Sequence, residues 1–250
     1  MFTEHPVFEK PADENATIWR YLDFTKFVDM LDTGSLFFNR SDRFHDRFEG
    51  SYPQFNVKLR PEIYGRRKNA MTDAGLRGLS ETSKLFRRHI AINCWYLNSH
   101  ESAAMWRLYL KSNEGIAIQS TFSRLAESFL PGDDKIYSGV VKYIDYETQW
   151  MPEGNLFYPF VHKRLSFAHE NELRCVICRF PPSKDEKLDL TQETIDGGVS
   201  VPVDLSKLIA RIYVAPDSPS WLNRLVESVA RKYTINAPVI HSALASEPVY

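Results

Sequence analysis

Segments rich in β-branched and aromatic residues alternate with short helical patterns along this chain. The alternation predicts strands at 17–22 and 35–39, with a helix at 24–33 between them. Gly34 follows that helix, where glycine is typical of a left-handed C-terminal cap. We therefore expect an α/β (α+β) fold with a mixed, mostly antiparallel central sheet flanked by helices.

The same pattern predicts the remaining elements. Further strands are expected at 90–97, 116–120, 138–144, 172–180, 199–203, 208–214 and 238–242. Further helices are expected at 123–130, 158–168 and 218–232. Another is expected from Asn98 to about Lys111, because Glu101 follows Asn98 at the spacing of a capping box.

The chain has the length of one domain, and its 43% hydrophobic content suffices for one core. We expect an N-terminal extension at 1–16 and a single globular domain at 17–250, with a partly helical insertion at about 53–88. The oligomeric state and any lid motion of the insertion stay open.

Charge and targeting signals narrow the class of partner. The 31 basic and 32 acidic residues nearly cancel, so no global field indicates binding to nucleic acid or to a membrane. The first residues show no signal-peptide pattern, which predicts a cytoplasmic protein. Three cysteines do not form a disulfide framework.

An arginine interrupts the first predicted strand. At period two, Arg20 shares a face with Ile18 and Leu22, whereas Trp19 and Tyr21 share the other face. A buried arginine needs an anionic partner, which is either a ligand or a structural carboxylate at a sheet edge.

A dense polar run follows the second predicted strand. It includes Arg40, Ser41, Asp46 and Glu49, with two phenylalanines between them. Such a run is expected either to bind something polar or to form a solvated loop with aromatic anchors.

The helix after Asn98 carries Ser102, Met105, Trp106 and Tyr109 on one stripe. The stripe predicts core packing, with Ser102 and Tyr109 as candidate polar contacts to a ligand.

The fourth candidate cluster joins two elements. Lys163 lies on the predicted helix at 158–168, and Glu170, Glu172 and Arg174 project to one face of the predicted strand. Two adjacent carboxylates raise one pKa, which suits acid–base chemistry. The alternative is a surface ladder in which Arg174 pairs with Glu172.

Other signals are weak. Cys175 and Cys178 form a CxxC pair, but in a strand they face opposite sides, and the seven histidines lack metal-site spacing, so we expect no metal. The sequence contains no glycine-rich phosphate loop and no HExxH motif.

Four segments carry a family resemblance: the WRY strand, LFFNRSDRFHDRFEG, NCWYLNSHESAAMWRLYLKSNEGIAI and KRLSFAHENELR. With these, the chain resembles the prokaryotic family catalogued as domain of unknown function 2971 over roughly residues 17–216. It departs from that family at Asp46-Arg47, where a proline commonly follows the aspartate, and this puts the turn geometry of the loop in doubt.

A second resemblance is to the ADP-ribosyltransferase superfamily, some of whose members are toxins or phage-defence enzymes. The resemblance implies NAD as a substrate, with Arg20 on its pyrophosphate, and Tyr21, Trp106 or Tyr109 against a base. It implies that Glu172 stabilises the ribosyl cation and that Glu170 activates the acceptor. The superfamily's Ser-Thr-Ser element has no clear counterpart here, and Ser41 and Ser102 are candidates.

Two other functions stay open. In a noncatalytic module that binds a nucleotide or another phosphorylated ligand, Arg20, Arg40, Lys163 and Arg174 would supply charge. In a metal-dependent nuclease, the ligands would be Asp46, Glu49, Glu170 and Glu172.

Overall fold

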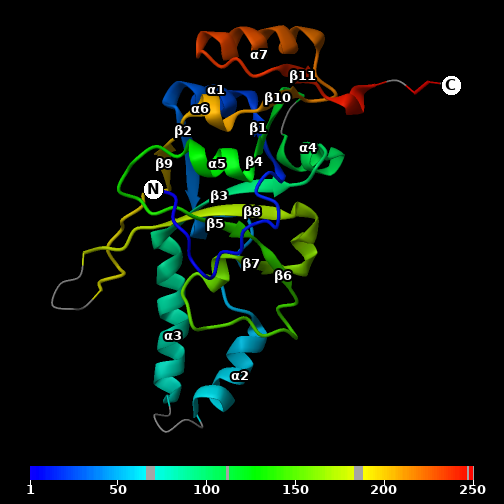
Figure 1. The fold of residues 1–250 in the computed structure, drawn as a ribbon. Helices are drawn as coiled ribbons and strands as arrows, with labels where there is room; N and C mark the ends of the chain where they lie inside the picture. Colours follow the sequence, from blue (N-terminus) through cyan, green and yellow to red (C-terminus); the bar gives the residue numbers. More distant parts are fainter. Residues whose placement is uncertain (66–70, 111–112, 183–187, 247, 250) are drawn as a thin grey trace.

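A mixed, mostly antiparallel sheet forms the centre of the molecule (Figure 1). The computed structural model describes residues 1–65, 71–110, 113–182, 188–246 and 248–249. Across the sheet the strands lie in the order β11 (Val239–His241), β10 (Arg211–Val214), β4 (Gly115–Thr121), β1 (Thr17–Asp23), β3 (Ile90–Leu97), β2 (Ser35–Arg40) and β9 (Gly198–Pro202). β8 (Glu172–Cys178) also pairs with β3, and β5 (Tyr137–Val140) pairs with β8. Only the β10–β11 pair of this sheet is parallel among the described strands, so the expected fold class is confirmed.

Helices cover the sheet. The largest core cluster takes residues from α1 (Phe24–Thr33), α5 (Phe122–Ser128), α6 (Leu205–Leu208) and α7 (Ser220–Lys232). α4 (Ala103–Tyr109) packs on β1, whereas α2 (Gln54–Gly65) and α3 (Asp73–Phe86) extend away from the sheet, at the other end of the molecule from α7 (Figure 1). Short 3-10 helices lie at Ser41–Arg43, Arg87–His89, Tyr158–Phe160, Leu165–Glu170 and Ala243–Ala245.

The alternation in β1 forms two cores. Ile18 and Leu22 belong to the large cluster beneath the helices, whereas Trp19 and Tyr21 pack with α4. Gly34 ends α1 with φ of +58°, so the left-handed cap is confirmed. Period-two patterning thus determined which side of the sheet each apolar residue of β1 faces.

The sheet is split next to β3. β2 pairs with β3 at Ala91 and Ile92, and β1 pairs with it at Tyr96 and Leu97. Within the described residues, the stretch 93–95 between these contacts has no strand partner on that edge. The split matters because unpaired backbone groups there must bond to side chains or to a ligand.

Residues 158–168 do not form the expected helix. The short strand β7 (His162–Arg164) lies between two 3-10 helices and pairs in parallel with β6 (Lys142–Ile144). That pairing joins segments some 20 residues apart, and a local helical period does not register it. Similarly, the strand expected at 138–144 is interrupted at Val141, whose N–H donates to the carbonyl of Glu172.

The expected capping box at Asn98 is also wrong. The helix begins later, and Ser102 is its N-cap, accepting a hydrogen bond from the N–H of Met105 at 3.4 Å. Asn98 instead donates its backbone N–H to Thr17 and its side chain to the hydroxyl of Tyr96. The helix ends at Tyr109, and the expected end at Lys111 lies outside the described residues.

Smaller differences concern the ends of the chain. The strand expected at 208–214 is divided into α6 and β10, and α7 begins at Ser220, with Pro219 as its N-cap. Within residues 1–16, Phe8 is buried in a second core cluster with Phe157 and Phe160. The expected division into an extension and one domain stays a prediction.

Candidate functional site

A cavity of about 740 Å³ opens at the split in the sheet. Its walls come from β1, β2, the unpaired part of β3, the loop after β2, α1, α4 and the segment that leads into β8. Of the residues expected from the sequence to form a site, those that line it are Arg20, Tyr21, Asp46, Tyr109, Lys163, Glu170 and Glu172. Residues far apart in the sequence therefore meet at one hollow.

The side chain of Arg20 extends from β1 to the unpaired part of β3. Its Nη1 donates to the carbonyl oxygen of Cys94 at 2.9 Å, and the guanidinium lies over the Trp95 ring at 5.9 Å. Burial lowers the pKa of the guanidinium, but an arginine side chain stays protonated in proteins. Within the described residues no carboxylate forms an ion pair with Arg20. Arg20 is half-buried, and a partly desolvated cation without an anion is unfavourable, so its position favours a ligand that carries negative charge.

A left-handed residue brings the two carboxyl groups together. Glu170 ends a 3-10 helix, Asn171 follows with φ of +34°, and Glu172 begins β8. Asn171 is fixed by its carbonyl, which accepts from the N–H of Leu97 at 2.9 Å. The two acids were expected on one face of a continuous strand, but a turn, and not period two, aims them at the same cavity.

Lys163 binds both acids. Its Nζ contacts Glu170 and lies 2.6 Å from Oε1 of Glu172, and Arg174 contacts Oε2 of Glu172 at 2.6 Å. Burial alone would raise the pKa of Glu172, but Arg174 and Lys163 outweigh it and hold that pKa well below its usual range.

The second acid has the opposite environment. Burial raises the pKa of Glu170, and the adjacent Glu172 raises it further, to about 8. Near neutral pH one carboxyl of the pair is therefore ionised and the other holds a proton, which is the arrangement that acid–base chemistry uses.

The aromatic residues expected at the site have different positions. Tyr21 and Tyr109 line the cavity, but the indole of Trp106 lies behind Tyr21, with ring centroids 4.9 Å apart, and donates to Glu101. The hydroxyl of Tyr21 accepts a hydrogen bond from the N–H of Ser102 at 2.9 Å. Trp106 and Ser102 thus support the wall without lining it.

Four other candidates do not line the cavity. Arg40 pairs with Asp42 and Glu193, and the hydroxyl of Ser41 donates to the carbonyl of Arg87. Glu49 and Arg174 pair with each other, with both side chains 0% exposed. Arg40, Ser41 and Glu49 belong to the polar run that was singled out from the sequence. The fourth candidate of that run, Asp46, does line the cavity and pairs with Arg164.

Several cavity residues were not singled out from the sequence. Phe167 lies beside Lys163, whose Nζ is 4.6 Å from the ring centroid, and Trp95 lies under Arg20. His45, Lys26 and Asn39 also line the hollow. Phe167 lies three residues before Glu170, and His45 directly precedes Asp46, so sequence proximity could have found both. Trp95 appears as an ordinary strand residue.

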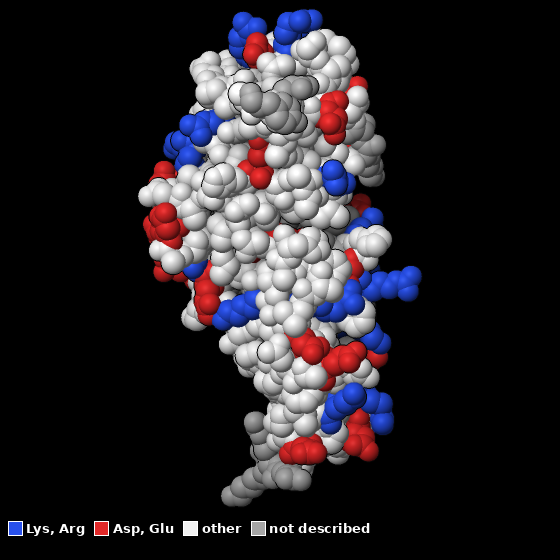
Figure 2. Space-filling model, turned by 90° about the vertical axis from the view of Figure 1, so that its right-hand side faces the viewer, with Lys and Arg blue, Asp and Glu red and all other residues white. Residues whose placement is uncertain are grey.

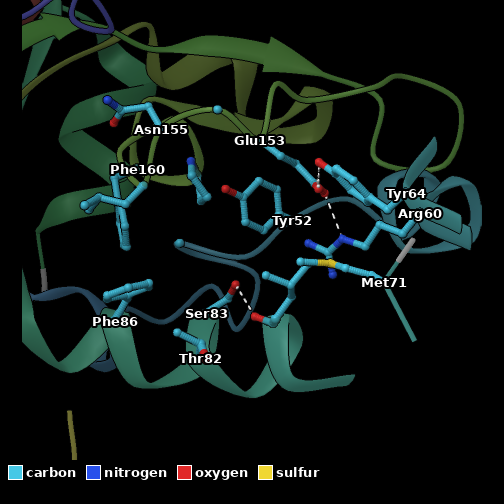
Figure 3. Close-up of a pocket in the computed structure, with 15 residues that line it drawn as sticks. Tyr52, Arg60, Tyr64, Met71, Thr82, Ser83, Phe86, Glu153, Asn155 and Phe160 are labelled. Carbon is cyan, nitrogen blue, oxygen red and sulfur yellow. Dashed lines mark hydrogen bonds and ion pairs between the residues drawn. The ribbon is translucent and has the colours of Figure 1, made fainter. Parts of the chain in front are cut away.

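A smaller cavity of about 290 Å³ lies between α2, α3 and the segment 153–160 (Figure 3). Tyr52, Tyr64 and Met71 line it, with the buried pair of Arg60 and Glu153 at 2.9 Å. None of the candidate site residues reaches this cavity. The Arg60–Glu153 pair instead joins α2 to the body of the protein.

The described residues contain no group of three or more His, Cys, Asp or Glu side chains placed to hold a metal ion. Of the four acids considered for a nuclease, Glu49 has both oxygens bound by Arg174, at 2.6 and 2.8 Å. The geometry therefore does not favour that alternative.

Surface charge matches the composition. On the face seen in Figure 2, lysine and arginine are interspersed with aspartate and glutamate. No helix within the described residues is long and apolar enough to cross a membrane.

The fold and the cavity define the class of protein: a mixed α/β domain with a charged hollow at a split in its sheet. No family model matches the chain, and no curated protein matches it. The resemblance to domain of unknown function 2971 therefore stays a prediction. Among solved structures, DarT from Thermus sp. 2.9 in complex with carba-NAD+ is similar at a TM-score of 0.38 and 8% identity, over 92% of this chain and 96% of that chain. At that TM-score the likeness assigns no function.

Proposed function

We propose that the cavity at the split sheet binds NAD and that the protein cleaves its nicotinamide–ribose bond, passing ADP-ribose to a nucleophile or to water. One observation carries the proposal: Arg20, which has no acidic partner among the described residues, lines the same cavity as the Glu170–Glu172 pair. An anion-binding group, a carboxylate that stays ionised and a second carboxyl that can be deprotonated to act as a base are suited to this reaction.

The size and lining of the cavity support a nucleotide ligand. Its volume of about 740 Å³ lies within the usual range for small-molecule pockets. Tyr109 and Phe167 offer aromatic faces, and Arg20 and Lys163 offer positive charge. We expect the guanidinium of Arg20 to donate hydrogen bonds to the pyrophosphate of bound NAD. The pyrophosphate would then supply the negative charge that no acidic residue supplies to Arg20 among the described residues.

The chemistry needs both carboxyl groups. The bond between ribose C1′ and the nicotinamide nitrogen breaks, and its electron pair returns to that nitrogen, which becomes neutral. The ionised Glu172 offsets the positive charge that grows on the ribose. The acceptor O–H attacks C1′, and its proton goes to Glu170 in its ionised form.

The test is release of nicotinamide from NAD by the purified protein, measured by chromatography with water and with a range of hydroxyl acceptors. Arg20→Lys removes the planar fork and is expected to raise KM about tenfold or more, the scale of a lost charged hydrogen bond. Arg211→Lys is the matched control, since Arg211 is exposed on β10 and does not line the cavity.

A binding module would give a different result. If wild-type protein binds NAD by calorimetry but releases no nicotinamide with any acceptor, the noncatalytic reading replaces this proposal. If it neither binds nor cleaves NAD, the assignment of the cavity to this ligand fails.

A further inference from the structure

A row of five charged side chains runs from the interior of the protein to the wall of the cavity. From the inside outward they are Glu49, Arg174, Glu172, Lys163 and Glu170, and each contacts the next. Arg174 binds both oxygens of Glu49, at 2.6 and 2.8 Å, and Oε2 of Glu172 at 2.6 Å. This row of charges thus links the interior of the protein to the carboxyl pair at the cavity.

The inner two members do not reach the cavity. Arg174 and Glu49 are both fully buried, and Arg174 also donates to the carbonyl of Phe160 at 2.9 Å. A buried ion pair of this kind is weak evidence for stability, because desolvation offsets most of its attraction. Its position next to Glu172 suggests another role.

The backbone on both sides of Glu49 is constrained. Gly50 has φ of +68°, and a Cβ there would lie 2.4 Å from Phe160. Only glycine therefore allows the chain to approach Phe160 so closely. On the other side, Arg164 binds Asp46, three residues before Glu49, at 2.7 Å.

We propose that Glu49 and Arg174 are positioning residues, which hold Glu172 in place and set how much negative charge the Glu170–Glu172 pair can carry. The assignment deepens the proposed function, because the pair they control is the one proposed to act on NAD.

The physical reason is charge balance. With Glu170 protonated, the two cations and the two anions in this row of five side chains cancel. Loss of the Glu170 proton then adds one uncompensated negative charge. Removing the charge of Glu49 leaves Arg174 in excess, which favours ionised carboxyl groups nearby. The pKa of Glu170 should therefore fall.

Other groups that face Glu170 are accounted for. Lys163 on β7 and Glu172 on β8 contact it or lie beside it. The phenols of Tyr109 on α4 and Tyr143 on β6 interact electrostatically with Glu170. Burial raises the pKa of both phenols well above the usual value, so they stay neutral. Among the described residues, Glu49 forms its ion pair with Arg174 and none with these groups.

The experiment titrates Glu170 directly, by NMR of protein labelled with ¹³C at the glutamate carboxyl carbons, with Glu170→Gln used to assign the signal. In Glu49→Gln the midpoint of Glu170 should move to lower pH by about half to one unit, the scale of one charge removed at an effective dielectric near 20. Asp134→Asn, which breaks the pair with Arg179 elsewhere, is the matched control and should leave it in place.

A second variant covers the case in which Glu49→Gln does not fold. Glu49→Asp keeps the charge but shortens the reach to Arg174, so it should leave the midpoint of Glu170 near that of the wild type. It should lower kcat for NAD cleavage while KM is unchanged, because Glu49 does not touch the ligand.

The outcomes separate the two proposals. The titration needs no activity, so a shifted midpoint without NAD cleavage supports the positioning role and refutes the proposed reaction. A midpoint that is the same in Glu49→Gln and wild type overturns the positioning role, as does Glu49→Asp with wild-type kcat.

Discussion

Two glutamates separated by one residue have opposite protonation because their neighbours differ. Arg174 and Lys163 outweigh burial at Glu172, whereas burial and the adjacent anion dominate at Glu170. The sequence shows both acids but not which one keeps its proton. That assignment depends on which oxygen each cation contacts, and only the folded chain defines it.

At the residue scale, this difference predicts a pH dependence. A base must be ionised to accept a proton, so NAD cleavage should rise with pH and level off above the Glu170 pKa of about 8. Glu170→Gln should lower kcat by about 10²- to 10⁴-fold, the usual contribution of a general base. Initial rates across pH 6 to 10 in wild type and variant measure both effects, and a flat profile in wild type contradicts the role.

The residue scale also shows where sequence reasoning selected correctly. Arg20 stood out because it interrupts an apolar row, and it lies at the cavity. Arg40 and Arg174 stood out for their charge alone, and both are held in ion pairs away from the cavity wall. Charge along a sequence indicates that a partner exists, but not whether that partner is another side chain or a ligand.

At the scale of elements, local patterns predicted most strands and helices, and failed where distant segments pair. Gly34 illustrates a local rule that holds, because its left-handed φ follows from the end of a helix. The segment 158–168 illustrates a failure, because β7 forms through contact with β6. Asn98 is bound by Thr17, far earlier in the chain, and so does not cap α4.

The two kinds of glycine give an element-scale prediction. Gly34→Ala should destabilise the protein by about 1 kcal/mol or more, because a Cβ is strained at positive φ even where space is free. Gly78→Ala, in the exposed interior of α3, should stabilise by about 0.5–1 kcal/mol. Urea denaturation of both variants measures the changes in the free energy of unfolding. Two changes of the same sign would contradict the different roles given to these glycines.

At the scale of the whole molecule, the α2–α3 hairpin and the cavity are separate. None of the described residues of 54–65 and 71–86 lines the large cavity, and the buried Arg60–Glu153 pair joins α2 to the body. Glu153 also accepts hydrogen bonds from Asn56 and Tyr64 (Figure 3 shows Tyr64). Breaking the Arg60–Glu153 pair should therefore destabilise the packing of α2 and α3 on the body without loss of the ligand site.

Glu153→Gln tests this separation. Leaving Arg60 without its buried anion should speed amide hydrogen exchange in α2 and α3. Affinity for NAD, or for ADP-ribose as a probe, should stay near the wild-type value. Exchange measured by mass spectrometry, with calorimetry on the same protein, checks both. A large loss of affinity would show that the hairpin and the cavity are coupled.

The sequence by itself determined the class of fold, the faces of β1 and the helix end at Gly34, because each depends on local periodicity or on the conformational freedom of one residue. It also brought Arg20, Glu170 and Glu172 forward as candidates. The tertiary structure decided which of the charged residues share a cavity, where the sheet splits, and which glutamate keeps a proton. These features depend on contacts between distant segments, and on the burial that those contacts create, so no local pattern encodes them.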